Sequence, residues 1–187
     1  VGRLIAARAL GQEVPGMTIN RYCASGLEAI AIASAKINAG MGHCYVAGGA
    51  ESMSLLPMTG YKLVPSYKAA MENINYHVSM GVTAEAVAEK YKVTREEADE
   101  FSVRSHKLAA EAIQGGKFRD EIVPVKVKEV FVQDDKRVEK EYTVDTDEGV
   151  RADTTFEALS KLKPVFKTGG VVTAGNASGI NDGAAAL

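Results

Sequence analysis

The chain alternates between helix-like and strand-like patterns of apolar positions. Apolar residues recur with helical spacing over residues 1–10, and a Gly/Pro-rich turn follows over 11–16. A short strand is predicted over 17–20, a second helix over 25–39, and a second strand over 44–47. Strands that alternate with helices are typical of an α/β layer fold.

The rest of the chain divides by composition into a long polar segment and a short glycine-rich segment. Residues 52–168 are more polar and helical, with a long hairpin near the mixed-charge run 126–141, and residues 169–187 return to strand and glycine. We therefore predict that 52–168 is an insertion between two parts of one domain, 1–51 and 169–187. Because the first and last residues lie inside apolar patterns, we expect the chain to be a piece of a longer protein.

The predicted helix 25–39 follows a cysteine, Cys23. Ser25 and Glu28 have the spacing of a capping box, and apolar residues surround the helix almost completely, so we predict that it is buried. A helix N-terminus lowers the pKa of a thiol and makes a thiolate available near neutral pH. From the residues alone two interpretations of Cys23 stay open, an activated nucleophile or a small buried side chain.

Composition narrows the possible partners. The 187 residues are 46% hydrophobic and 25% charged, with a net charge of −2, which is typical of a globular protein without a nucleic-acid partner. No apolar run reaches the roughly 18–20 residues of a membrane span. Two cysteines, Cys23 and Cys44, are too few for a disulfide framework and favour a reducing compartment.

Candidate ligand groups are few. The three histidines have no metal-ligand spacing among themselves or with the cysteines, so no metal site is expected. Glycines at 48, 49, 175, 179 and 183 allow close backbone approach, and their N–H groups are suited to a carbonyl oxygen or a phosphate-bearing ligand. Simple turn formation is the alternative for each of them.

Six blocks together resemble the thiolase family of acetyl-CoA acetyltransferases and 3-ketoacyl-CoA thiolases: NRYCASGLEAI, AGGAESMS, MGVTAEAVAEKY, FRDEIVPV, RADTTFEALSKLKPVF and VTAGNASGINDGAAAL. The resemblance implies an α/β, thiolase-like layered α-β-α fold. Residues 1–51 and 169–187 would be a partial N-terminal domain with the nucleophile. Residues 52–168 would be the mostly helical loop domain that covers coenzyme A (CoA) and supports contacts between subunits.

The resemblance also assigns residues. Cys23 matches the acyl-accepting nucleophile, whose backbone N–H would contribute to an oxyanion hole. Ser178 matches the serine that contacts the pantetheine arm of CoA. Four other residues fall in segments that line the CoA groove in relatives: Met80, Arg151, Phe166 and Ala174. Solvated surface is the alternative for Arg151, and core packing is the alternative for Phe166.

The implied activity is thiolytic cleavage of a 3-ketoacyl-CoA, or the reverse Claisen condensation, through an acyl-enzyme on Cys23. CoA is a substrate, and no metal or redox cofactor is implied. The resemblance further implies a homodimer or homotetramer, without nucleic acid or membrane as partners. The expected location is the cytoplasm in a bacterium, or the mitochondrial or peroxisomal matrix in a eukaryote.

Several departures from the family pattern limit these expectations. The family's Gly-His-Pro, Cys-Gly-Gly and Asn-Glu motifs do not occur in these 187 residues, so we expect the chain alone to lack turnover. Cys44 does not match the second catalytic cysteine and is predicted to be core filler. Ser79, where short-chain biosynthetic relatives have histidine, favours a broader, degradative specificity.

Two alternatives remain beside the thiolase interpretation. A non-catalytic acyl-CoA-binding or structural fragment of a thiolase-like protein would share the six blocks without the activity. A decarboxylating ketoacyl synthase relative would share the cysteine at the start of a helix, but it fits less well because those enzymes lack a long loop domain opening with MGVTAE.

Overall fold

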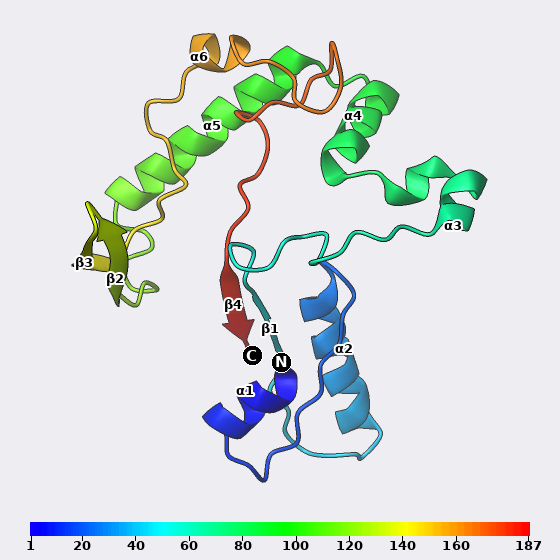
Figure 1. Cartoon of the computed structure of the whole chain (residues 1–187), viewed down its shortest axis with the longest axis vertical. Coiled ribbons are helices and arrows are strands. Elements are labelled where there is room, and N and C mark those ends of the chain that lie inside the picture. The colour runs from blue at the N-terminus through cyan, green and yellow to red at the C-terminus, as the bar shows by residue number, and fades with distance from the viewer. The chain divides into compact units, whose positions relative to one another are not determined.

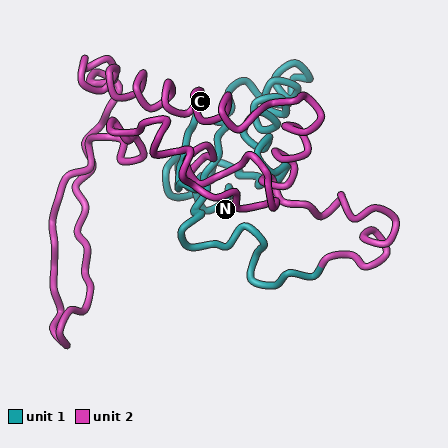
Figure 2. The backbone as a smooth tube through the Cα atoms, turned by 90° about the horizontal axis from the view of Figure 1, so that it is seen from above, with its two compact units in different colours: residues 1–64, 180–187 teal, residues 65–179 magenta.

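The computed structural model describes all residues from 1 to 187 and divides them into two compact units (Figure 2). Unit 1 comprises residues 1–64 and 180–187, and unit 2 comprises 65–179. The boundaries expected from the sequence lie after residues 51 and 168, so residues 52–64 belong to unit 1 and residues 169–179 to unit 2, contrary to expectation. The functional division into a catalytic part and a loop domain stays a prediction.

Unit 1 contains two helices and one two-stranded sheet. The helices are α1 (Gly2–Ala9) and α2 (Ser25–Asn38), and the strands are β1 (Gly48–Glu51) and β4 (Gly183–Ala186) (Figure 1). The strands pair antiparallel, with Gly48 opposite Ala186. Ala47 and Leu187 exchange two further backbone hydrogen bonds of 3.0 and 2.8 Å. The chain therefore returns to its first strand after more than 120 residues, as the glycine-rich end predicted.

Of the two short strands predicted in this unit, the first does not form and the second is wrong in position. Residues 17–20 are irregular, and the strand expected over 44–47 begins instead at Gly48. A strand needs a hydrogen-bonded neighbour, and β4 supplies one from Ala47 onward but not earlier. β-propensity alone could not locate that partner.

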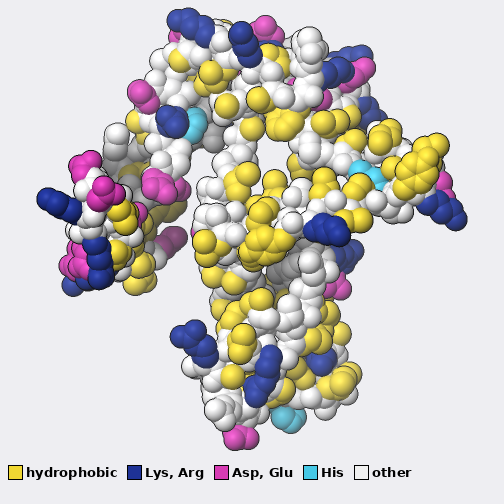
Figure 3. All heavy atoms as spheres, in the orientation of Figure 1, with side chains coloured by type: hydrophobic (Ala, Val, Ile, Leu, Met, Phe, Trp, Pro, Cys, Tyr) yellow, Lys and Arg dark blue, Asp and Glu magenta, His cyan; other side chains and the backbone are white.

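The second helix agrees with prediction in its extent but not in its burial. No residue of α2 is buried, and Leu27 is 72% exposed. Among the elements, β1 packs against α2, and a two-stranded sheet is too small to cover a helix that is apolar all round. Hydrophobic side chains accordingly lie on the visible surface in Figure 3.

The predicted capping box of α2 is also wrong. Ala24 is the N-cap, and it makes no side-chain cap. Ser25 Oγ instead accepts a hydrogen bond from the Arg21 N–H at 2.8 Å and donates one to the Tyr22 carbonyl at 2.6 Å. Glu28 forms an ion pair with Arg21. Both side chains therefore stabilise the turn before the helix rather than its first N–H groups.

Unit 2 is mostly helical. Its helices are α3 (Tyr67–Glu72), the 3₁₀ helix η1 (Ile74–His77), α4 (Met80–Tyr91), α5 (Arg95–Gln114) and α6 (Phe156–Ser160), and its strands β2 (Val125–Gln133) and β3 (Lys136–Val144) form a hairpin. Lys92 adopts a left-handed conformation that ends α4, and Thr94 with Glu97 forms a true capping box that begins α5. α6 packs on α5. The mixed helical and hairpin content predicted for this part of the chain is confirmed.

None of the helices of either unit has the length and apolar character needed to cross a membrane.

The hairpin turns through two residues, Asp134 and Asp135. Both have positive φ values, 51° and 58°, as a type I′ turn requires. Because glycine adopts this conformation without a steric cost, we expect Asp135→Gly to stabilise the hairpin by about 0.5–1 kcal/mol. Slower amide exchange across β2 and β3 would measure this gain. Asp135→Val should have the opposite effect, and equal exchange in both variants would contradict the assignment.

A polar contact within unit 1 joins the segment after β1 to the segment before β4. The Ser54 hydroxyl and backbone N–H, the latter at 2.8 Å, both donate to the Asp182 carboxylate. The hydroxyl bond, followed by the backbone bond, lowers the pKa of Asp182 below its ordinary value. This contribution to stability is present above the pKa of an unfolded aspartate and is lost as the pH falls through the lowered value.

Ser54→Ala tests this contact. The substitution should raise the pKa of Asp182 toward its ordinary value, because it removes the Ser54 hydroxyl, whose hydrogen bond is the main cause of the lowered pKa. A carboxyl ¹³C titration by NMR measures the change, with Ser52→Ala as the control. An Asp182 midpoint that does not move would contradict the contact.

Candidate functional site

Cys23 lies on a sharp turn directly before α2. Tyr22 has a positive φ of 50°, which is uncommon for a residue with a bulky side chain. The Asn20 side chain accepts a hydrogen bond from the Tyr22 N–H at 2.9 Å, and Ser25 braces the same turn from the other side. Backbone strain of this kind is concentrated at functional sites, where neighbouring groups hold it in place.

The thiol of Cys23 is accessible. Its side chain is exposed, and its backbone N–H has no hydrogen-bond acceptor within the chain. The free N–H groups at the start of a helix and the helix dipole favour negative charge at this point. The Cys23 side chain is exposed in this chain, as that of Cys44 is, and its role as a nucleophile stays a prediction.

Cys44 is exposed as well, so the prediction that it is core filler is wrong for this chain. The reason is the same as for α2, since unit 1 has too little structure to enclose its apolar residues. Cys44 differs from Cys23 in its position, because it lies in an irregular segment and not at a helix start. It therefore provides an accessible internal control for the reactivity of Cys23.

The residues assigned to CoA all lie in unit 2. Met80 is the first residue of α4, and Phe166 lays its ring against the backbone of Gly81, where a Cβ atom would overlap the ring. Lys167 forms a 2.7 Å ion pair with Glu89 one helical turn beyond Glu85. This hydrogen-bonded pair lowers the pKa of Glu89 and raises that of Lys167. The segment before residue 170 is thus attached along α4, with Phe166 against Gly81, the residue after Met80.

The following segment, residues 171–178, contains Ala174 and Ser178, and we call it the contact loop. The buried carboxylate of Glu85 accepts hydrogen bonds from the Val171 and Val172 N–H groups at 2.9 and 2.8 Å. The loop has no helix or strand of its own, so this carboxylate on α4 supplies backbone partners that secondary structure would otherwise provide.

A second carboxylate holds the loop from α5. Asp99 is 1% exposed and accepts hydrogen bonds from Arg95 Nε at 2.7 Å and from Asn176 Nδ2 at 2.9 Å. Asn176 in turn donates to the Val171 carbonyl at 2.9 Å and accepts from the Thr173 N–H at 2.8 Å. We call Glu85, Arg95, Asp99 and Asn176 the loop clamp.

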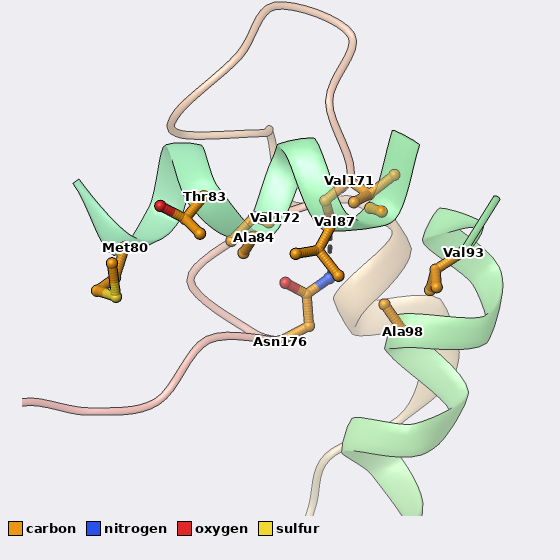
Figure 4. A pocket seen from close by; sticks show the side chains of 10 residues that line it. Met80, Thr83, Ala84, Val87, Val93, Ala98, Val171, Val172 and Asn176 are labelled. Carbon is orange, nitrogen blue, oxygen red and sulfur yellow. Dashed lines mark hydrogen bonds between the residues drawn. The ribbon is translucent and has the colours of Figure 1, made fainter. Parts of the chain in front are cut away.

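The contact loop borders an open hollow of about 450 Å³. Figure 4 shows Met80, Thr83, Ala84 and Val87 along α4, with Asn176 pointing toward the helix. The remaining lining residues are also mostly apolar: Ala88, Val93, Ala98, Val171 and Val172. The hollow offers an apolar wall that includes Val171 and Val172 of the loop.

The other residues assigned to CoA have fewer contacts with the rest of unit 2. Arg151 is exposed, and its backbone N–H donates to His106 Nδ1 on α5 at 3.2 Å. Ser178 and Ala174 are exposed, and the Ser178 hydroxyl donates only to the neighbouring Gly179 carbonyl at 3.2 Å. The structure therefore places Phe166 beside Gly81 at the start of α4 and leaves Arg151 on a separate loop. Cys23 belongs to unit 1, and its place relative to these residues stays a prediction.

The loop clamp was not predicted from the sequence. Glu85 precedes Ala88 by three positions, and these two are the buried residues of α4. A charged residue on the buried face of a helix indicates a paired group, and this signal was available from the spacing. The partners Asp99 and Asn176 are 77 residues apart in sequence, and no local pattern connects them.

The fold and the exposed cysteine define a mixed α/β chain with a thiol at a helix start. The model of the thiolase N-terminal domain family matches residues 3–187. The 3-ketoacyl-CoA thiolase of Bacillus subtilis (strain 168) is 50% identical over 183 residues, which are 97% of this chain and 47% of that protein.

Solved structures of thiolases also match this chain. Human mitochondrial 3-ketoacyl-CoA thiolase matches with a TM-score of 0.78 and 35% identity, over 99% of this chain and 48% of that one. The structure of the same human enzyme in complex with CoA matches with a TM-score of 0.74, also at 35% identity, over 98% and 48%. The chain belongs to the thiolase family and corresponds to its N-terminal domain. It spans about half the length of the relatives it matches. The expectation of a partial, thiolase-like α/β fold is confirmed.

Proposed function

We propose that this chain carries the nucleophile and CoA-binding residues of a thiolase-type acyltransferase. The observation that carries the proposal is the exposed Cys23 at the start of α2, on a turn held by Asn20 and Ser25. Its likeness to enzymes named 3-ketoacyl-CoA thiolase supports a 3-ketoacyl-CoA substrate.

In the proposed reaction the Cys23 thiolate attacks the keto carbon of the substrate. The bond between C2 and C3 breaks, its electron pair forms the enolate of acetyl-CoA, and a proton converts that enolate to acetyl-CoA. The acyl group remains on Cys23 as a thioester until the thiolate of a second CoA removes it. The Cys23 N–H, which has no acceptor within the chain, is suited to stabilise the oxyanion of the addition step.

The proposal places CoA on unit 2. Met80, Phe166, Ala174 and Ser178 would contact it beside the apolar hollow, with Arg151 as a charged contact. CoA enters as a substrate, and the reaction as written needs no metal or redox cofactor. Assembly into a homodimer or homotetramer, and a cytoplasmic, mitochondrial or peroxisomal location, belong to the same proposal for the intact protein.

Acyl transfer from 3-ketohexanoyl-CoA tests the function directly. Cleavage between C2 and C3 leaves a butanoyl group on the thiol, whereas simple thioester exchange leaves a 3-ketohexanoyl group. Trypsin separates the cysteines, since peptide 22–36 contains Cys23 and peptide 37–62 contains Cys44. Mass spectrometry should find butanoyl on peptide 22–36 only, with acetyl-CoA released in equal amount.

The alternative outcomes are distinct. CoA binding without a butanoyl adduct would favour a non-catalytic acyl-CoA-binding fragment. Only 3-ketohexanoyl adducts, at similar levels on both peptides, would contradict nucleophilic activation of Cys23. We expect one adduct per chain without repeated turnover, because the family's Gly-His-Pro and Cys-Gly-Gly motifs do not occur in these residues.

A further inference from the structure

The contact loop depends on two buried carboxylates that belong to helices. Within the loop, the backbone bonds are short-range: the Asn176 N–H donates to the Thr173 carbonyl at 3.3 Å, and the Gly175 N–H donates to Thr173 Oγ1 at 3.2 Å. These turns shape the loop but do not attach it to the helices. Glu85 on α4 and Asp99 on α5 make that attachment.

The attachment is built in a largely dehydrated position. Glu85 is 5% exposed, Asp99 is 1% exposed, and Thr173 is fully enclosed. Burying a carboxylate is unfavourable unless hydrogen bonds compensate, and here each carboxylate has at least two donors. Arg95 completes the arrangement, because it also donates to the Leu159 and Leu162 carbonyls at 2.6 and 3.0 Å.

We propose that Glu85 and Asp99 are positioning residues for CoA binding, because they hold the contact loop in the conformation that presents Ala174 and Ser178. The inference rests on the proposed function, which makes those two residues CoA contacts. Neither carboxylate is accessible to a ligand, so each acts through the loop. A loop that is released spends less time in the binding conformation, and the apparent affinity falls in proportion to that fraction.

Glu85→Gln is the main variant. The amide keeps one acceptor oxygen, but its NH₂ group faces a backbone N–H that has lost its partner. If the loop adopts the binding conformation in about one-tenth of the molecules, the dissociation constant for CoA should rise about tenfold. Isothermal titration calorimetry measures this constant. Amide exchange should accelerate in residues 171–178 while the exchange of α5 stays unchanged.

Three further variants separate positioning from general damage. Glu100→Gln alters the exposed carboxylate next to Asp99 and should leave both readouts unchanged. Glu85→Asp keeps the charge but shortens its reach, so it should give intermediate values even if Glu85→Gln folds poorly. Ser178→Ala should weaken CoA binding without accelerating amide exchange in residues 171–178, because it removes a proposed contact and leaves the loop clamp intact.

The outcomes distinguish this inference from the function on which it rests. If the unsubstituted chain does not bind CoA, the proposed function is overturned and the inference falls with it. If the unsubstituted chain binds CoA and folded Glu85→Gln or Glu85→Asp binds it equally well, the inference alone is overturned. Unchanged amide exchange in residues 171–178 of folded Glu85→Gln would also overturn it.

Discussion

Replacing Asp99 by alanine should lower the free energy of unfolding of unit 2 by about 3–5 kcal/mol. The substitution leaves the Arg95 guanidinium without its carboxylate in a mostly buried position and removes one acceptor of the Asn176 amide. An unpaired buried charge costs more than a lost contact, because its desolvation is no longer compensated. Urea denaturation followed by circular dichroism, which is dominated by helices such as α5, measures the change.

Glu100→Ala is the matched control for Asp99→Ala, because it removes an exposed carboxylate at the next position of the same helix. Its effect should lie within about 0.5 kcal/mol of zero, as for other exposed positions. If Asp99→Ala changes the free energy of unfolding by less than 1 kcal/mol, the loop clamp has no stabilising role.

Replacing Cys23 by alanine should abolish the butanoyl adduct from 3-ketohexanoyl-CoA. The variant removes the sulfur that forms the thioester, and the other thiol, that of Cys44, lies in an irregular segment away from the helix start. The expected loss is complete within the sensitivity of mass spectrometry. The release of acetyl-CoA should disappear in parallel.

Cys44→Ala provides the control for chemical reactivity, because Cys44 is also exposed but lies away from a helix start. This variant should form the adduct at the rate of the unsubstituted chain. A Cys23→Ala variant that still releases acetyl-CoA would show that another group cleaves the substrate. The thiolase mechanism would then be wrong for this chain.

Local patterns predicted those elements whose signals lie within a few residues. The helix 25–39 agrees with α2 to within one residue, because an unbroken apolar and alanine-rich run favours helix whatever surrounds it. The charged hairpin was also predicted, since β2 and β3 are adjacent in sequence and joined by a two-residue turn. Cys23 was identified because its position before the helix is itself a local feature.

Features that need a distant partner were predicted poorly. β1 is defined by β4, which lies more than 120 residues later, and the expected strand was therefore placed four residues too early. The capping box at Ser25 failed because Arg21 and Tyr22 compete for the same side chains. The burial expected for α2 and Cys44 failed because few other elements of unit 1 cover them.

By itself the sequence determined the helices at 1–10 and 25–39, the hairpin, the cysteine at the helix start and, through six blocks, the family. These features depend on residue types and short spacings, which do not require any tertiary contact. Only the tertiary structure decided that Glu85, Asp99 and Asn176 meet around the contact loop and that Phe166 packs on Gly81. The physical reason is that buried polar groups and ring contacts gain their free energy from partners far apart in sequence, and no local preference specifies those partners.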